Sequence, residues 1–399
     1  MQPLLDGPRA ALDDAIVTAL LTSTPTLAIA YGCTRLTSAL ALIDDITEYM
    51  TEGSTIGRDS TATVQGSCTL LFDTNCPLNY LAELAAPYMT LTNPDTGDVA
   101  QFNLGVYSLQ SPTYDNSAAP TVQTFQGYDL NYLLNQELGD SYMLAAGSDP
   151  LQAMVDLIVA VLPGVAVTFT PTSKTPPKDM VWPSGQQDPY NSTNGTNTYL
   201  TIVNDVLNSI GYAPLWVDWD GTFQMTPYVS PVDLDPEWTF DLTDEHNIVA
   251  EARTSYQDTY DVPNYWQFIM SGLTTEPVEG ETQFTYIDTS PRNITSTVNR
   301  PFVIRSIYFV DAVDYDSLVA LAVQQITLDL APAETFTIST SPFPLAWQYD
   351  QIQLNDPNLI LVPVAFDPAR RVQALQWSLP LDGQSDMDWT LMTVPDVGD

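Results

Sequence analysis

Residues 63–72 carry an alternating pattern that restricts the folds open to this chain. Apolar residues occupy one set of positions (Val64, Cys68, Leu70, Phe72) and polar residues the other (Thr63, Gln65, Ser67, Thr69). Because successive side chains of a strand point to opposite faces, this pattern predicts a strand with one buried and one solvated face. The ranges 99–109 and 122–127 continue it. Together these segments predict an antiparallel sheet or a barrel wall.

The period of the pattern changes at Asp129. Beyond this residue, several segments place apolar residues at every third or fourth position, which predicts helices. These segments are 130–138, 150–162, 199–210 and 314–330. We expect Asp129 to cap the first helix and Gly139 to follow its end.

Strand patterns return after Pro236, so the chain is β-rich on both sides of a mixed segment. A short amphipathic helix beginning at Pro8 predicts an N-terminal arm. An acidic, insertion-like loop is expected at 272–299, between strands at 264–270 and beyond Pro301. The length suits two or three domains. The expected fold class is α+β and β-rich.

The charge of the chain excludes several classes of partner. There are 49 acidic residues against 11 basic ones, a formal charge of −38. Gripping a nucleic acid requires clustered Lys and Arg, and an anionic membrane surface attracts the same residues. Only two lysines occur, Lys174 and Lys178, so the imbalance comes mainly from missing bases. Two interpretations of this imbalance are a protein that must avoid holding a polyanion and the acid-loaded surface of a halophilic protein. The shortage of bases favours the first.

The three cysteines, Cys33, Cys68 and Cys76, have no metal-ligand spacing, and reduced, buried thiols are expected. No signal peptide is recognised, and the apolar stretch 26–43 is interrupted by Arg35, which argues against a membrane span. We therefore expect assembly in a reducing cytoplasm.

Candidate catalytic residues are few. His246 is the single histidine, so a Ser–His–Asp or Cys–His centre would depend on it, and a structural role is favoured. Asp218 and Asp220, in WVDWDG, are a paired carboxylate that a glycosidase could use. The Asp220-Gly221 dipeptide also predicts a hairpin turn, which is the favoured interpretation. The same residues match only a fragment of a calcium loop, without its distal Glu.

Other conspicuous residues have structural interpretations. Gly105 and Gly127 lie within strand patterns, where bulges or close packing are favoured over ligand contact. The aromatic residues Tyr256, Tyr260, Tyr265 and Trp266 are expected in the core or in interfaces rather than on a sugar platform. Lys174 and Lys178 lie in the 171–198 loop, where they could pair with an acidic neighbouring subunit or remain solvated. We expect no catalytic, cofactor-binding or metal-binding residue.

An ordered series of short strings resembles one protein family. In chain order it contains 102–107 (FNLGVY), 127–129 (GYD), 219–223 (WDGTF), 261–264 (DVPN) and 300–304 (RPFVI). In that order and spacing the chain resembles the baseplate hub, or tail-associated protein, of tailed bacteriophages, in a version similar to the minor tail proteins of actinobacterial siphophages. The resemblance runs from about residue 40 to the C-terminus.

The resemblance implies two tail-tube-like antiparallel β-barrels flanking a mixed α/β domain. The arm would be 1–25, the first barrel 26–127, the mixed domain 128–235 with a contribution from 272–299, and the second barrel 236–399. Three such subunits would form a ring that matches a hexameric tail tube. The resemblance also implies a virion tail-tip location, assembly in the bacterial host, and no enzymatic activity. The chain ends soon after its last expected strand, which argues against a lytic extension.

The implied partners are other copies in a homotrimer, the distal tail or tail tube protein, the tape measure protein, and tail fibre or other tip proteins. Genomic DNA would pass through the channel without specific binding, and carboxylates facing the channel would repel its phosphates. The alternatives are a peripheral distal-tail or receptor-binding protein, a glycan hydrolase using Asp218 and Asp220, and a calcium-stabilised adhesin.

Overall fold

The computed structural model describes residues 28–394, apart from 95–96, 98, 116–120, 184–196, 242–248, 274, 346, 348–349, 356–368 and 383–385. The expected N-terminal arm and His246 lie outside the described residues. The chain forms two compact units. Unit 1 contains the described residues of 28–129, 235–257 and 334–394, and unit 2 contains those of 130–234 and 258–333.

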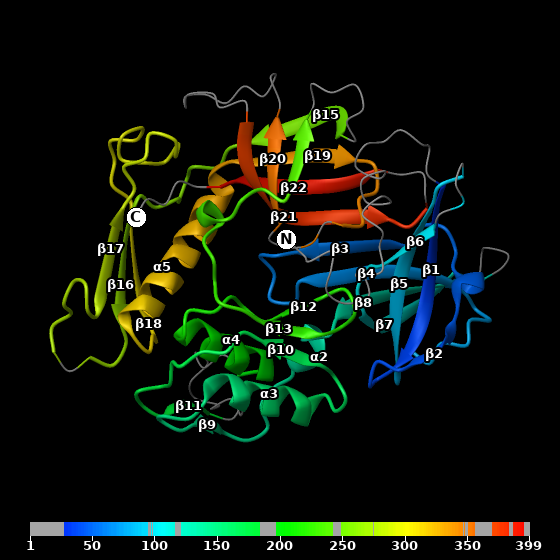
Figure 1. The fold of residues 1–399 in the computed structure, drawn as a ribbon, viewed down its shortest axis with the longest axis horizontal. Coiled ribbons are helices and arrows are strands. Elements are labelled where there is room, and N and C mark those ends of the chain that lie inside the picture. The colour runs from blue at the N-terminus through cyan, green and yellow to red at the C-terminus, as the bar shows by residue number, and fades with distance from the viewer. Residues whose placement is uncertain are drawn as a thin grey trace. The chain divides into compact units, whose positions relative to one another are not determined.

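Unit 1 is built on one fourteen-stranded sheet (Figure 1). Its first eight strands are β1 (Ala28–Thr37), β2 (Leu42–Asp45), β3 (Thr55–Asp59), β4 (Gly66–Asp73), β5 (Glu83–Thr92), β6 (Val99–Asn103), β7 (Tyr107–Asp115) and β8 (Val122–Asp129). The others are β14 (Trp238–Asp241), β15 (Val249–Tyr256), β19 (Thr335–Thr340), β20 (Gln351–Asn355), β21 (Ala369–Pro380) and β22 (Met387–Thr393).

The two sets of strands in unit 1 join where β21 pairs antiparallel with β3, with Ser378 opposite Gly57. The main strand order is β15-β19-β22-β21-β3-β4-β8-β7-β5-β1-β2. Segments more than three hundred residues apart in the chain therefore share one hydrogen-bonded sheet. Within the described residues no sheet closes on itself, so the expected pair of barrels is not confirmed.

The alternation is confirmed from Gly66 on, within β4, whereas Gln65, expected on the solvated face, precedes the strand and is only 3% exposed. Cys68, Leu70 and Phe72 are at most 4% exposed, whereas Ser67 between β3 and β8 faces outward. The buried face continues across the neighbouring strands to Ile56 and Phe125. The hydrophobic effect acting on this one face therefore sets the register, because a slip by one residue would turn the apolar set toward water.

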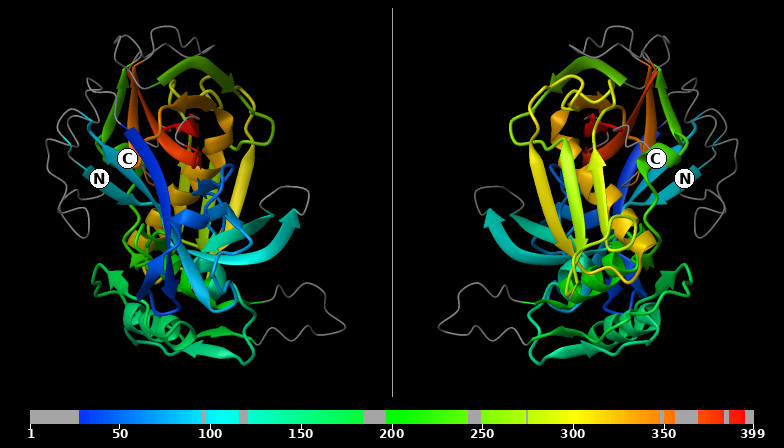
Figure 2. Two further views of the ribbon diagram at one scale, coloured as in Figure 1. Left: turned by 90° about the vertical axis from the view of Figure 1, so that its right-hand side faces the viewer. Right: turned by 90° about the vertical axis from the view of Figure 1, so that its left-hand side faces the viewer.

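Unit 2 combines short sheets with helices. Its first part contains α2 (Asn131–Leu134), β9 (Tyr142–Leu144), α3 (Pro150–Val161), β10 (Val167–Phe169), β11 (Met180–Trp182), α4 (Tyr199–Ser209), β12 (Trp216–Val217) and β13 (Phe223–Met225). Its second part contains β16 (Tyr265–Met270), β17 (Gln283–Ile287), β18 (Arg305–Val310) and α5 (Tyr315–Leu330). In that second part α5 lies along the three-stranded sheet β17-β16-β18 (Figure 2).

Three of the four expected helices are confirmed: α3, α4 and α5 match the segments 150–162, 199–210 and 314–330. Asp149 Oδ1 accepts hydrogen bonds from the backbone N–H groups of Leu151 and Gln152, at 3.0 and 3.1 Å, at the start of α3. Asp314 caps α5 in the same way through the N–H of Ser317, at 2.8 Å. An Asp at this position satisfies helix N–H groups that otherwise have no partner.

The expectation for Asp129 is wrong. α2 ends at Leu134, its N-cap is Leu130, and no side chain caps it. Asp129 is instead the last residue of β8, fully buried, and its Oδ2 accepts a hydrogen bond from the N–H of Gly66 at 2.6 Å. Because its carboxylate is engaged in unit 1, it does not cap the following helix. The 272–299 segment also differs from the expected loop, since it contains β17.

Candidate functional site

The turn between β12 and β13 contains the carboxylate pair expected from the sequence. The hairpin is confirmed, with Trp216 opposite Gln224 in an antiparallel register. Asp218 Oδ1 accepts hydrogen bonds from the backbone N–H groups of Thr222 at 2.9 Å and Asp220 at 3.2 Å. Its Oδ2 accepts one from the Gln224 side chain at 2.8 Å. Asp218, which is only 7% exposed, therefore uses both oxygens to close its own turn.

The two carboxyl groups differ in pKa because they are buried and lie next to each other. Burial, together with a hydrogen bond and the charge of Asp220, raises the pKa of Asp218 to about 7. Burial alone would raise the pKa of Asp220 as well, but hydrogen bonds from Asp218 and Thr222 lower it. The pair therefore holds one proton near neutral pH, because two adjacent carboxylates do not both ionise freely.

The position of this pair favours the hairpin interpretation over a glycosidase. A glycosidase places its two carboxyl groups on either side of the scissile bond, open to a cleft. Here the oxygens of Asp218 are engaged by neighbours in its own hairpin, and neither carboxylate lines the cavity described below. Asp218 thus stabilises its own turn.

We expect the contribution of Asp218 to stability to decline as the pH rises from about 4 to about 7. Between these pH values the folded chain keeps a proton on Asp218 that the unfolded chain releases. The proton therefore stabilises the folded chain fully below about pH 4, and this contribution is lost above about pH 7. Asp220, whose pKa is lowered, changes stability only in more acidic solution. Asp218→Asn mimics the protonated form, so its Tm should exceed that of the native protein by a few degrees at pH 8 and match it near pH 4.

Scanning calorimetry at these two pH values measures the effect. Asp140→Asn, at an exposed position of unit 2, serves as the control and should shift Tm equally at both. A Tm difference for Asp218→Asn that does not depend on pH would contradict the prediction.

Both lysines contact acidic or polar groups of unit 2. Lys174 Nζ donates a hydrogen bond to Ser317 Oγ at 2.8 Å and lies 3.3 Å from Asp314 Oδ1 at the start of α5. Lys178 Nζ lies 3.1 Å from Asp311 Oδ1, and both side chains are 56% exposed. The loop that carries them is therefore tied to α5 and to the end of β18.

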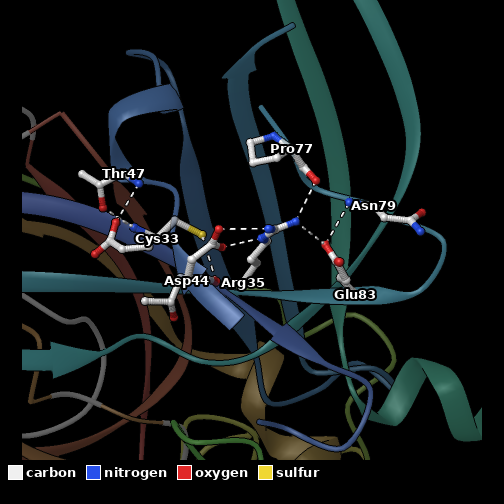
Figure 3. Close-up of polar contacts among 9 residues, drawn as sticks. Cys33, Arg35, Asp44, Thr47, Pro77, Asn79 and Glu83 are labelled. Atoms are coloured by element: carbon white, nitrogen blue, oxygen red, sulfur yellow. Dashed lines mark hydrogen bonds and ion pairs between the residues drawn. The ribbon is translucent and has the colours of Figure 1, made fainter. Parts of the chain in front are cut away.

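Arg35 connects three parts of unit 1 (Figure 3). Its guanidinium forms a two-pronged ion pair with Asp44 of β2, with Nη2 at 2.9 Å from Oδ2. Nη1 donates to the carbonyl of Pro77 at 2.8 Å and to Glu83 Oε2 at 3.3 Å. Glu83 Oε2 also accepts the backbone N–H of Asn79 at 2.9 Å. Arg35 thus joins β1, β2 and β5 to the loop before β5.

Other basic residues are engaged inside the protein in the same manner. Arg58 lies fully buried with Nη1 at 3.7 Å from Asp129 Oδ2. Arg300 donates to two backbone carbonyls of unit 2, and Arg305 lies 4.8 Å above the ring of Tyr265. These basic side chains are therefore engaged in contacts within the protein, which is consistent with a chain that does not grip phosphate.

The two glycines singled out in strands are explained by packing. Gly105 has φ +117°, and a Cβ built there would lie 2.9 Å from the hydroxyl of Tyr107. A Cβ on Gly127 would lie 2.5 Å from Cys68 Sγ. Both distances are shorter than ordinary contacts, so close approach, rather than a ligand, requires glycine at these positions.

The aromatic series divides between core and surface. Trp266 is fully buried and Tyr265 partly so, as the core interpretation predicts. Tyr256 and Tyr260 are 62% and 82% exposed, so they are not core residues. Cys33 and Cys68 are buried free thiols, whereas Cys76 is only partly buried.

Unit 2 contains a cavity that was not expected from the sequence. Its volume is about 580 Å³, and its walls come from β11, α4, α5 and the segments next to them. Asp205 and Asn208 project from one face of α4, three residues apart, and Lys178 and Asp311 lie at the rim. The spacing of Asp205 and Asn208 placed them on one face of a helix, and this was the only sign of the cavity in the sequence. The helical pattern does not indicate that residues of α5 and β11 line the same cavity.

The residues that the structure describes contain neither a membrane-spanning helix nor a metal-binding cluster. No helix among them is long and apolar enough to cross a membrane. Within the same ranges, no three acidic, histidine or cysteine side chains gather closely enough to hold a metal ion.

Several solved structures share this fold over nearly the whole chain. A tail protein from Neisseria meningitidis MC58 superposes with a TM-score of 0.59 at 14% identity, covering 92% of this chain and 98% of that one. The 43 kDa tail protein of prophage MuSo2 from Shewanella oneidensis has a TM-score of 0.59 at 10% identity, covering 93% and 100%. The prophage tail protein gp18 from Listeria monocytogenes EGD-e has a TM-score of 0.52 at 10% identity, covering 90% and 94%.

These similarities confirm the expected resemblance at the level of the fold: the chain has the fold of phage tail proteins. No protein-family model and no curated protein sequence matches it. The similar structures indicate no catalytic family.

Proposed function

We propose that this chain is a structural hub of a phage tail tip, which forms a trimeric ring that continues the tail tube. The observation that carries the proposal is the similarity to phage tail proteins along almost the full length of both chains. A similarity confined to one domain would fit many roles, because single folds host unrelated functions. A match that includes both units supports a shared architectural role.

In this proposal the two strand sets of unit 1 supply the tube-like parts of the ring. They belong to the ranges 26–127 and 236–399, while 128–235, with 272–299, forms the mixed domain. Three chains with two tube-like parts each would match a six-fold tube. Closure of the ring would also cover the sheet edges, which otherwise offer unpaired backbone groups to other chains.

The charge of the chain supports a conduit function. A channel for the tape measure protein and then DNA must let a polyanion pass without retaining it. The formal charge of −38, together with basic residues engaged in internal contacts, suits such a wall. The distal tail or tail tube protein and tail fibre proteins would be the neighbours of the ring at the virion tail tip.

We expect three copies of the chain per particle, arranged around the tail axis. Sedimentation equilibrium of the purified protein should give three times the chain mass of 43.8 kDa. Cryo-electron microscopy of tails should place a three-fold ring around the channel. Density for the chain only at the periphery of the tip would instead support a distal-tail or receptor-binding component.

A further inference from the structure

The cavity of unit 2 has a lining that selects for positive charge. Three carboxylates, those of Asp179, Asp205 and Asp311, line it together with the single ammonium of Lys178. Two negative charges therefore remain without a counter-charge in the lining. Burial, and then the charge of Asp311, raise the pKa of Asp205, although its side chain keeps one side open to solvent. A cation entering the cavity would relieve this repulsion.

The lining also offers hydrogen-bond acceptors that the described residues do not use. Trp182 Nε1 donates to Asp205 Oδ2 at 2.8 Å, and no described residue donates to the other oxygen. Lys178 occupies Asp311 Oδ1 and leaves its Oδ2 available. Asn208 Oδ1 is buried and accepts no hydrogen bond from any described residue. Leaving a buried acceptor unsatisfied costs free energy, so a donor that meets the Asn208 amide when it turns toward the cavity would be favourable.

These acceptors lie on separate elements. Their separation favours a guanidinium over a metal ion or an ammonium, for the following reasons. Asp205 and Asn208 belong to α4, whereas Asp311 follows β18. A metal ion would need its ligands gathered around one point, and the described residues contain no such group. A guanidinium presents five N–H donors in a plane and can reach acceptors spread around it, whereas an ammonium is a compact point charge.

Apolar side chains complete the site. Trp182 of β11 and Leu321 and Leu328 of α5 line the same cavity. Long basic side chains bury their methylene groups against such surfaces while the charged end remains with polar groups. The cavity thus provides both a polar end and an apolar wall for one extended cationic side chain.

We propose that this cavity binds the guanidinium group of an arginine side chain presented by a partner protein. The α-carboxylate of free arginine would meet an acidic lining whose single lysine is already paired with Asp311. A side chain within a polypeptide carries no such carboxylate. We take a different protein as the source, because this chain is strongly acidic and its Arg35, Arg58 and Lys174 are engaged in internal contacts. The inference goes beyond the proposed hub function and does not depend on it.

The test uses the full chain labelled with 5-fluorotryptophan, with the Trp182 signal assigned through Trp182→Phe. N-acetylarginine methylamide is the probe, and the matching citrulline compound, which has the same shape without the charge, is its control. Titration with the arginine compound should shift the Trp182 fluorine signal. The citrulline compound should bind at least about tenfold more weakly, because charge-assisted hydrogen bonds are lost. Free arginine should also bind more weakly than the capped compound.

Two variants distinguish binding from a structural effect. Asp205→Asn and Asn208→Leu should each weaken binding of the arginine compound about tenfold. Asn208→Leu removes a buried acceptor without a partner, so its Tm should stay equal or rise, which excludes unfolding as the cause. Asp140→Asn, outside the cavity, should bind like the native protein.

Equal binding of the arginine and citrulline compounds would overturn the proposal. So would an equal loss of binding in Asp140→Asn, which would indicate attraction to the acidic protein as a whole. Tighter binding of free arginine than of the capped compound would assign the cavity to a small molecule instead. None of these results bears on the number of copies in the tail, so the hub proposal is tested separately.

Discussion

Replacing Asp129 by asparagine should lower the free energy of unfolding of unit 1 by about 3–5 kcal/mol. Asp129 and Arg58 are 0% and 1% exposed, and Nη1 lies 3.7 Å from Oδ2. The asparagine keeps an oxygen for the N–H of Gly66 but loses the negative charge that faces the guanidinium. A buried cation that loses its counter-charge is strongly destabilising, because it remains removed from water.

The rest of the Arg58 environment cannot move away to compensate. Its guanidinium carbon lies 3.8 Å from the ring centroid of Trp347, which is 2% exposed. A Cβ on Gly66 would lie 2.8 Å from Asp129 Oδ2, so the strands already approach as closely as glycine permits. Arg58 of β3 thus contacts β8 through Asp129 and the segment between β19 and β20 through Trp347.

The double variant Arg58→Met/Asp129→Asn supplies the decisive comparison. Replacing both charged groups of a buried pair is often nearly neutral, so the double variant should recover most of the stability that Asp129→Asn loses. Lys178→Met removes an exposed pair and should cost less than about 1 kcal/mol. Urea unfolding followed by tryptophan fluorescence measures all of them. The single variant Arg58→Met completes the comparison. If the double variant loses as much stability as Asp129→Asn and Arg58→Met together, the two charges do not stabilise each other.

The helices show what local sequence can predict in this chain. α3 and α5 begin at Asp149 and Asp314 because a cap acts through the next few N–H groups, all encoded within four residues. Asp129 has the same local context but a different outcome, since Arg58 and Gly66 recruit its carboxylate from across the sheet. Tertiary contacts override local preference where a charged group is buried.

The sheets show the same division. Alternation identified β4 and its buried face, because that signal resides within one strand. The pairing of β21 with β3 could not be read from either segment, since nothing in 55–59 specifies a partner so distant in the chain. The β12–β13 hairpin with Asp218 and Asp220 was predictable from Asp220-Gly221. The cavity was not, because its walls come from segments spread over 178–328.

Trp266→Ala should lower the free energy of unfolding of unit 2 by about 3–5 kcal/mol. Trp266 is fully buried between the sheet β17-β16-β18 and α5, where it packs with Phe268, Leu318 and Ile326. Deleting the ring removes apolar burial and leaves a cavity that the neighbouring elements fill only in part. The loss should be concentrated in the second part of unit 2.

The indole N–H adds a polar contribution to this packing. Trp266 Nε1 donates to Asp329 Oδ2 at 2.8 Å, and the Tyr308 hydroxyl donates to the same oxygen at 2.8 Å. Burial, followed by Asp329, raises the pKa of Tyr308 to about 12, so its hydroxyl remains a donor at neutral pH. Trp266→Phe keeps most of the ring volume and loses the N–H, so it should cost about 1–2 kcal/mol.

Phe309→Ala is the matched control, because it removes an aromatic ring from the outer face of the same sheet, where Phe309 is 71% exposed. It should change the free energy of unfolding by less than about 0.5 kcal/mol. Hydrogen exchange should show faster exchange in β16, β18 and α5 for Trp266→Ala, and little change for Phe309→Ala. Because α5 also lines the cavity through Leu321 and Leu328, Trp266→Ala should weaken arginine binding as well. Loss of stability with unchanged exchange in α5 would mean that Trp266 does not hold the helix to the sheet.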